Sequence, residues 1–200
     1  MLERAIAAAR TGDASIENQR FEGVTLEKGD LSHLELNEIH FLRCRFTDCD
    51  FSDALFYDCR FERCDFSNCR FVDGYFKKCN MQGCRGDGAV FTDARLRDSV
   101  FSSCALSYAN FSGSSWVDCM LEACRLQESF WPGAKLKNMK FSGCDLRKAE
   151  FFRTPLKGLD FSNCEIEGLM VSEGCGELRG LAIGVEQAPI IAAMLGVKIR

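Results

Sequence analysis

The sequence has little of the chemistry on which catalysis usually depends. Only two of its 200 residues are histidines, His33 and His40, and only three are prolines. The histidines lack the partner residues of a nucleophilic or metal site, and we expect both to be exposed turn residues. The glycine-rich stretch GCRGDG lacks the lysine of a phosphate-binding loop. We therefore expect no enzymatic activity, no cofactor and no bound metal.

Long apolar runs are also missing. Without a stretch of about 18 apolar residues, we expect no membrane-spanning segment. The N-terminal MLERAIAAARTGDAS mixes charges into its apolar residues, which favours a short amphipathic helix over a secretion signal. Residues 1–15 are therefore predicted to form a helix that either caps the coil or contacts a partner. We expect one soluble cytoplasmic domain whose 13 cysteines remain thiols.

A five-residue period runs through most of the chain. From Phe21 to Val171 every fifth residue is large and apolar, in 31 consecutive positions of which only Gly86 fails. Fifteen of the 17 phenylalanines fall on this series. Two residues before each member comes a second series of mostly small residues, which holds every cysteine except Cys175. Such regularity indicates one repeated structural unit.

The period matches neither an α-helix nor an ordinary strand. Within a unit such as Cys-Arg-Phe the side chains alternate in, out, in as in a strand, and turn formers such as Ser-Asn follow. A short strand and a turn, repeated without interruption, must coil around an axis. Both apolar series then point inward, and the other three residues of each unit face water.

The units CDFSN, CRFTD and YANFSG resemble pentapeptide repeats over roughly residues 16–171. This resemblance implies an all-β fold, a right-handed quadrilateral parallel β-helix in which four pentapeptides make one square coil. At the ~4.8 Å spacing between strands, the coils would form a rod on the order of 35 Å long. Residues 172–200 remain as a C-terminal helix-strand module for capping and dimerisation.

The regular cysteines could indicate a metal site, disulfides or simple packing. Neighbours in an internal column would have parallel Cβ vectors ~4.8 Å apart, which suits neither a disulfide nor a tetrahedral zinc site. We therefore predict that cysteine is a small, buried, unreactive hydrophobe. The predicted core ladder comprises Phe41, Phe61, Phe101, Phe141, Cys44, Cys64, Cys84, Cys104, Cys124, Cys144 and Cys164. Gly86 removes one large side chain and marks either a kink or a harmless packing gap.

The C-terminal region contains a predicted helix from Glu186 to Leu195. Pro189 suits its first turn and Gly196 its end. Its apolar face consists of Ile190, Ile191, Met194 and Leu195. Such a helix either only caps the coil or also pairs with a second copy, and we expect both, giving a tail-to-tail homodimer.

The stretch LRGLAIGVEQAPIIAAMLGVKIR is similar to the ending of the quinolone-resistance (Qnr and MfpA) pentapeptide proteins. This resemblance implies a rod-like dimer that mimics B-form DNA and binds a type II topoisomerase, DNA gyrase or topoisomerase IV. The uninterrupted register resembles the loopless members of that group. It also means that the loops with which other members protect the topoisomerase are missing here.

The charge of the chain is uneven. The net charge of -4 arises within residues 1–40, and the remainder is balanced. Sorting residues by face of the coil places acidic residues together on the face of Phe51, whereas the next face carries mostly lysine and arginine. The predicted acidic strip comprises Asp30, Asp50, Asp53, Asp73, Asp93, Glu150 and Glu173. These side chains could either cap turns or form a partner-binding strip.

Two functions follow from these patterns. The first is a non-enzymatic, DNA-mimicking binder of a type II topoisomerase, which protects it from quinolones or toxins and does not bind nucleic acid itself. The alternative is a scaffold or adaptor that binds another protein. It would use the exposed apolar and aromatic residues Leu42, Leu55, Tyr57, Tyr75, Phe130 and Phe152.

Overall fold

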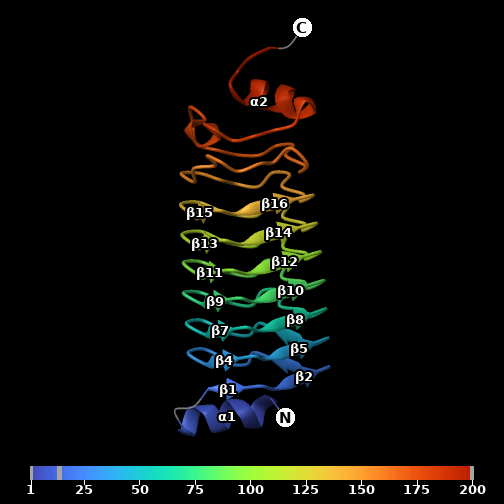
Figure 1. Cartoon of the computed structure of the whole chain (residues 1–200), viewed down its shortest axis with the longest axis vertical. Helices are drawn as coiled ribbons and strands as arrows, with labels where there is room; N and C mark the ends of the chain where they lie inside the picture. The colour runs from blue at the N-terminus through green and yellow to red at the C-terminus, as the bar shows by residue number, and fades with distance from the viewer. Residues whose placement is uncertain (1, 13–14, 199–200) are drawn as a thin grey trace.

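The computed structural model describes residues 2–12 and 15–198 as a straight solenoid with a helix at each end (Figure 1). Helix α1 spans Leu2–Gly12 and helix α2 spans Ala188–Met194, with two 3₁₀ turns before α2, η1 (Gly176–Leu178) and η2 (Val185–Gln187). The strands are β1 (Ile16–Glu17), β2 (Arg20–Glu22), β3 (Thr25–Glu27), β4 (Glu35–Asn37), β5 (His40–Leu42), β6 (Arg45–Thr47), β7 (Leu55–Tyr57), β8 (Arg60–Glu62), β9 (Tyr75–Lys77), β10 (Asn80–Gln82), β11 (Arg95–Arg97), β12 (Val100–Ser102), β13 (Ser115–Val117), β14 (Met120–Glu122), β15 (Lys135–Lys137) and β16 (Lys140–Ser142).

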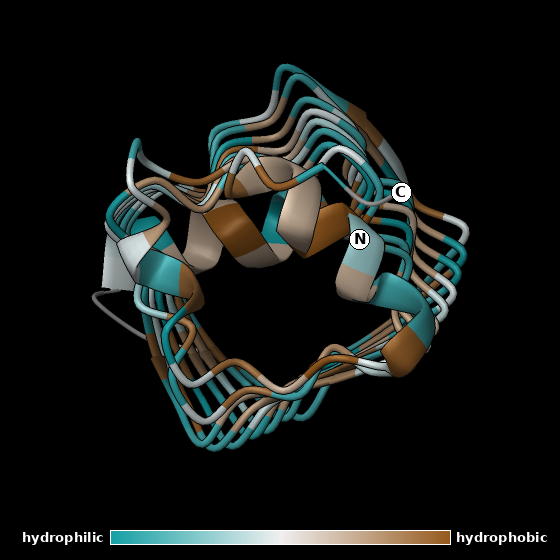
Figure 2. Cartoon of the chain, turned by 90° about the horizontal axis from the view of Figure 1, so that it is seen from above, coloured by the Kyte–Doolittle hydropathy of each residue, from teal (hydrophilic) through white to brown (hydrophobic). Residues whose placement is uncertain are grey.

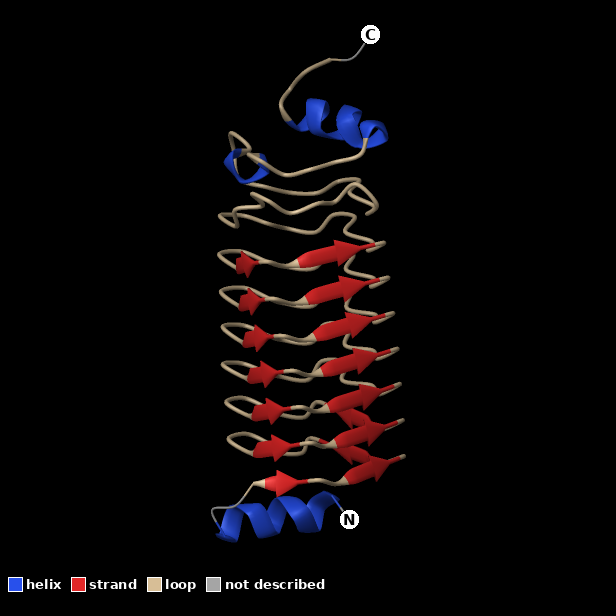
Figure 3. Ribbon diagram, viewed as in Figure 1, coloured by secondary structure: helices blue, strands red, loops and turns tan. Residues whose placement is uncertain are grey.

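Each strand pairs in parallel with the strand one coil away. Leu36 in β4, for example, lies opposite Phe56 in β7, 20 residues later. This pairing builds two seven-stranded sheets, β1-β4-β7-β9-β11-β13-β15 and β2-β5-β8-β10-β12-β14-β16, and the short sheet β3-β6. Isolated bridges such as Asp50 to Arg70 join the remaining sides, which Figure 3 draws as loop. Seen along its axis, the chain traces a four-sided ring (Figure 2), and the parallel β-helix expected from the sequence is confirmed.

A left-handed residue at the end of each repeat turns the chain into the next side. From Asn18 to Gly158, every fifth residue has a positive φ between 50° and 81°. Glycine adopts this conformation readily, and aspartate and asparagine adopt it more easily than most other residues. The turn formers noted in the sequence therefore fix the corners of the coil, and their side chains project outward.

The interior is filled by columns of side chains that repeat once per coil. All eleven residues of the predicted core ladder are buried, with exposed fractions of 6% or less. In the column of Phe51, the rings of Phe51, Phe71 and Phe91 stack with centroids 4.8 and 4.7 Å apart. Because stacked aromatic rings bury large areas at favourable offsets, each column is a continuous source of stability.

Gly86 does not bend the coil. Its amide donates to the carbonyl of Ala105 at 2.7 Å, as the equivalent residues do on other coils, and the bridge between Arg85 and Ala105 is intact. The Leu106 side chain fills the space above it, with Cδ2 3.0 Å from the place of a Gly86 Cβ. The missing side chain is thus compensated from the next coil, and the register continues.

The two ends of the coil are covered by helices. Leu2 and Ala9 of α1 are buried against the first coil, as the amphipathic pattern predicts. At the other end Ile190 and Ile191 of α2 are half-buried and pack against the core. The predicted helix begins later than expected, because Val185–Gln187 form a 3₁₀ turn. The expected final strand is not found in the described residues 195–198.

No helix among the described residues is long and apolar enough to cross a membrane.

Candidate protein-binding surface

Three aspartates form a column of exposed carboxylates at one corner of the coil. Asp53, Asp73 and Asp93 follow the stacked rings of Phe51, Phe71 and Phe91 by two residues, so each occupies a left-handed corner. All three are exposed. Neighbouring corners lie about 4.8 Å apart, the spacing of paired strands. Like charges at this distance repel each other, and a cationic partner would relieve the repulsion.

Of these three aspartates, only Asp53 has an ion-pair partner among the described residues. The Asp53 carboxylate lies 3.8 Å from Nδ1 of His33, which occupies the same corner one coil earlier and is exposed. The Asp93 carboxylate leans over Gly113, where its Oδ1 lies 2.1 Å from the place of a Cβ. Glycine at this corner therefore gives the carboxylate room. We call Asp53, Asp73 and Asp93 the acidic corner.

Asp30 and Asp50 accept hydrogen bonds from nearby residues of the same chain. The carboxylate of each accepts hydrogen bonds from the amide and hydroxyl of the serine two residues later, Ser32 and Ser52. Asp30 also forms an ion pair with Arg10 of α1 at 2.8 Å. The Ser32 hydrogen bonds, followed by Arg10, lower the pKa of Asp30 to about 2. These two aspartates therefore cap turns, which is the structural role left open by the sequence.

Glu150 and Glu173 lie apart from the acidic corner. The outer column that holds Asp30 and Asp50 continues through Arg70 before it reaches Glu150 several coils later. Glu173 follows the last coil, near the corner residue Arg153. The structure thus brings together the N-terminal members of the predicted strip and leaves the other two at the far end of the rod.

The neighbouring face carries aromatic and basic residues on β7, β9 and β11. The rings of Tyr57 and Tyr75 meet edge to face at 5.7 Å, and the Arg95 guanidinium lies 5.7 Å above the Tyr75 ring. Leu55, Tyr57 and Tyr75 are half-buried, as are Leu42, Phe130 and Phe152 on other faces. None of these six is as exposed as the sequence suggested.

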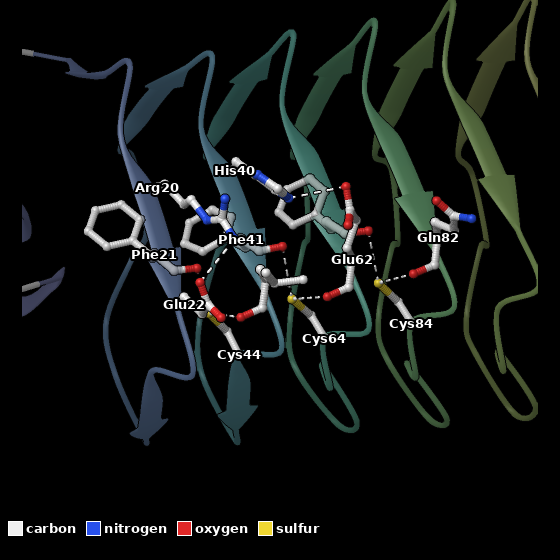
Figure 4. Close-up of polar contacts among 12 residues, drawn as sticks. Arg20, Phe21, Glu22, His40, Phe41, Cys44, Glu62, Cys64, Gln82 and Cys84 are labelled. Carbon is white, nitrogen blue, oxygen red and sulfur yellow. Dashed lines mark hydrogen bonds and ion pairs between the residues drawn. The ribbon is translucent and has the colours of Figure 1, made fainter.

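The histidines differ from each other. His33 is an exposed corner residue, as expected. His40, however, lies in β5, where its side chain is only 28% exposed and its Nε2 is 3.2 Å from Oε1 of Glu62 (Figure 4). The expectation of an exposed turn residue is wrong for His40. Its place next to the buried Phe41 puts it on a strand, where neighbouring coils cover it.

The stacked thiols donate weak hydrogen bonds to backbone carbonyls. The Cys64 thiol donates to the carbonyl of Phe41 at 3.4 Å, and Cys84 repeats the contact with Phe61 at 3.3 Å (Figure 4). All 13 cysteines lie among the described residues and are free, and 12 of them are buried. Within residues 2–12 and 15–198, no group of three His, Cys, Asp or Glu could hold a metal ion.

Two capping residues at the C-terminal end gave no signal in the sequence. The buried Gln187 donates from Nε2 to the carbonyls of Phe161 and Cys164, at 2.9 and 2.5 Å. The buried Glu177 accepts hydrogen bonds from the Arg153 amide, at 2.7 Å, and from the Ser172 hydroxyl. Outside the repeats no period identifies inward-pointing residues. In the same C-terminal region, Val185 and Val197 are exposed. Leu195, the outermost member of the predicted dimer face, is exposed as well.

A filled interior, a polar exterior and a regular coil define a solenoid repeat protein. Two models of known families match it: "Pentapeptide repeat region" over residues 54–131, and "Pentapeptide repeats (8 copies)" over residues 30–63 and 133–168. Together these matches cover more than half of the chain. The chain belongs to the pentapeptide repeat family.

Several solved structures are similar to this chain. QnrB1, a plasmid-mediated fluoroquinolone resistance protein, is 22% identical with a TM-score of 0.35, over 90% of this chain and 100% of that one. HetL, a pentapeptide repeat protein involved in heterocyst differentiation regulation from the cyanobacterium Nostoc, is 14% identical with a TM-score of 0.29, over 88% and 94%. Similarity this low says nothing about a shared partner. A comparison with curated proteins finds no match.

Proposed function

We propose that the protein binds a type II topoisomerase, DNA gyrase or topoisomerase IV, by presenting its acidic corner in place of a DNA backbone. The column of exposed carboxylates at Asp53, Asp73 and Asp93 carries this proposal. A DNA-binding groove is lined by lysine and arginine that neutralise phosphates, and a rigid row of carboxylates can occupy the same groove. The protein acts by binding alone, without catalysis or direct contact with nucleic acid.

The rigidity of the coil supports this role. The acidic corner rests on stacked phenylalanines, and its residues donate their own amides to the next coil, as Asp53 does to Val72 at 2.8 Å. A partner therefore meets charges that are already in place, which reduces the entropy lost on binding. In the proposed homodimer, α2 joins two rods tail to tail and doubles the length of the acidic surface.

A supercoiling assay with purified gyrase, with and without ciprofloxacin, tests the proposal. The wild-type protein should inhibit supercoiling or protect the enzyme at micromolar concentration. Reversing the acidic corner (Asp53→Lys, Asp73→Lys, Asp93→Lys) should abolish the effect. Lysine is tolerated at these corners, since Lys28, Lys78 and Lys148 already adopt the same positive φ.

The matched control reverses three aspartates at other corners, Asp48, Asp58 and Asp98. These are equally exposed and adopt the same left-handed conformation. The control variant changes the net charge by the same amount, so a specific site predicts that it keeps most of the activity. Equal loss in both variants would show a general charge effect, and no effect of the wild-type protein would remove the proposal.

A second candidate function is that of a protein-binding scaffold, favoured by the Tyr57, Tyr75 and Arg95 cluster. Half-buried tyrosines beside an arginine are residues that dominate many protein interfaces. A pulldown from a cell lysate separates the two functions, because topoisomerase subunits should dominate the bound fraction only under the first. Under the second, Tyr75→Ala should reduce the bound fraction and reversal of the acidic corner should not.

A further inference from the structure

The hydrogen-bond ladder of the coil opens at one place near its C-terminal end. On the side that contains β16, the residue after each strand donates its amide to the next coil: Gly83 to Ser102, Ser103 to Glu122 and Ala123 to Ser142, at 2.8–2.9 Å. The next donor in the column, Gly143, makes no such bond to Ser162. Among the described residues, no backbone hydrogen bond joins residues 135–143 to residues 155–163.

Pro155 explains why the ladder stops. It occupies the place at which Lys135, one coil earlier, donates its amide to the carbonyl of Ser114 at 2.8 Å. Proline has no amide hydrogen and cannot continue the ladder. The segment after Pro155 pairs with the chain beyond it instead: Leu156 donates to Glu177 at 3.0 Å and Phe161 to Ala182 at 2.9 Å. The two neighbouring sides of the coil formed by residues 155–163 thus make no backbone hydrogen bonds to residues 135–143 of the previous coil.

This separation leaves β15 and β16 as the last strands of their sheets. On β16 the register of the earlier coils aims the Phe141 amide, the Gly143 amide and the Met139 carbonyl toward the missing rung. An unpaired strand edge is a template for another strand. The first strands, β1 and β2, lie next to α1 (Figure 3), but no element of the described chain pairs with the edge of β16.

A groove of about 710 Å³ lies beside this edge. Residues 138–142 form one wall and Gly158, Asp160, Ser162 and Asn163 form the other. Met139 and Phe141 are almost fully buried, with exposed fractions of 4% and 5%, so they contribute little apolar surface, and the serines and asparagines contribute polar groups. The groove therefore offers free backbone groups, to which the backbone of an added strand can bind.

The groove itself is lined by one cation, Lys140, and one anion, Asp160, whose carboxylate accepts a hydrogen bond from the Ser162 amide at 2.8 Å. Lys135, Lys137 and Lys140 on the two edge strands, together with Lys157, are exposed, and none forms an ion pair with a described residue. Lysines on an edge strand deter pairing with neutral or basic segments. An acidic segment would instead neutralise them.

We propose that this groove binds an acidic peptide in extended conformation, which pairs with the exposed edge of β16 as an added strand. The peptide takes the place of the missing rung and runs parallel to β16. Backbone hydrogen bonds from Phe141 and Gly143 hold it, and the lysines select acidic side chains. The site lies on a different side of the rod from the acidic corner, and this inference does not rest on the proposed function.

Hydrogen exchange of the full-length protein tests whether the edge is free. The amides of Phe141 and Gly143 should exchange much faster than those of Leu121 and Ala123, which hold the same positions one coil earlier and are paired. A labelled acetyl-EVEVTVE amide peptide should then bind and slow exchange at Phe141 and Gly143. Equal protection of the four amides in the free protein would overturn the proposal.

Peptide and protein variants test the mode of binding. The same peptide with alternate backbone amides methylated, which removes its hydrogen bonds but not its charge, should bind at least tenfold more weakly. Lys137→Glu with Lys140→Glu should weaken binding about tenfold, since each exposed attraction becomes a repulsion of similar size. Lys77→Glu with Arg60→Glu, the equivalent positions on paired coils, should bind normally. Undetectable binding, equal binding of the methylated peptide, or binding without protection of Phe141 and Gly143 would each contradict the proposal.

Discussion

At the residue scale, cysteine in this protein is a packing residue that also donates a weak hydrogen bond. Ser99, Ser114 and Ser129 occupy the same small series, are equally buried and donate to nearby carbonyls. Alanine occurs there as well, for example at Ala54 and Ala94. The position therefore requires a small side chain and tolerates one that donates a hydrogen bond. Thiol chemistry is not needed, which agrees with the free state of all 13 cysteines.

Burial should make almost all of these thiols unreactive. Only Cys175 is partly exposed, with its thiol 3.7 Å from the Met194 carbonyl. A thiol reagent such as DTNB should label about one group per native chain and all 13 after denaturation. Cys175→Ala should abolish the native reaction, and Cys64→Ala should leave it unchanged. Rapid labelling of several thiols in the native protein would contradict a filled interior.

At the element scale, side chains from neighbouring coils fill the core together. Gly86, Leu106 and Leu126 belong to one column, and Leu106 covers the gap at Gly86. The stack of Phe46 and Phe66, at 5.1 Å, ends below that gap. The column tolerates the loss of one large side chain because the next coil supplies part of the volume.

Leu106→Ala should therefore destabilise the protein more than Leu126→Ala. Both remove a buried leucine, but the cavity at Leu106 joins the space above Gly86, so we expect about 5 kcal/mol against about 3 kcal/mol. Adding Gly86→Leu to Leu106→Ala should recover part of the loss, because the leucine volume moves by one coil. Urea unfolding of the four proteins provides the measurement. A double variant less stable than Leu106→Ala alone would show that the gap is not shared.

The C-terminal helix divides its apolar residues between two roles. Ile190 and Ile191 pack against the core, whereas Leu195 and Val197 are 58% and 55% exposed. If these outer residues join two copies, Leu195→Asp with Val197→Asp should halve the mass measured by analytical ultracentrifugation and leave the circular dichroism spectrum of the folded chain unchanged. Tyr108→Asp, at a residue 55% exposed in the middle of the rod, is the control. A wild-type protein that sediments as a monomer would contradict the proposed dimer.

At the scale of the whole molecule, the buried thiols make stability depend on pH. Burial raises the pKa of the Cys79 and Cys119 thiols. An unfolded chain loses these protons above about pH 8.5, whereas the folded chain keeps them until the pH reaches the raised value. The stabilisation is thus fully present below about pH 8.5 and declines as the pH rises.

The free energy of unfolding should consequently fall between pH 8 and 10 in a reducing buffer. Cys79 and Cys119 each contribute up to about 1.4 kcal/mol per pH unit. Urea unfolding at several pH values provides the measurement, and replacing both residues by alanine should reduce the slope. A stability independent of pH in this range would show that the thiols ionise as easily in the folded chain as in the unfolded one.

Much of the molecule was determined by the sequence itself. The five-residue period predicted the coil, its buried columns and its polar exterior, because the direction of each side chain follows from its position within a short repeat. The same reasoning identified α1, the corner aspartates and an apolar C-terminal helix. It did not identify the break in the hydrogen-bond ladder at Pro155, the hydrogen bonds that Asp30 and Asp50 accept, or the caps made by Glu177 and Gln187.

Those features were decided by the tertiary structure, because each depends on which groups meet across coils. Whether Asp30 is free depends on Ser32 and on Arg10 of a helix outside the repeats. Whether Pro155 opens the ladder depends on the alternative partners that residues 177–182 offer to the segment after it. A local pattern fixes where a side chain points, but only the folded chain determines which groups that side chain contacts.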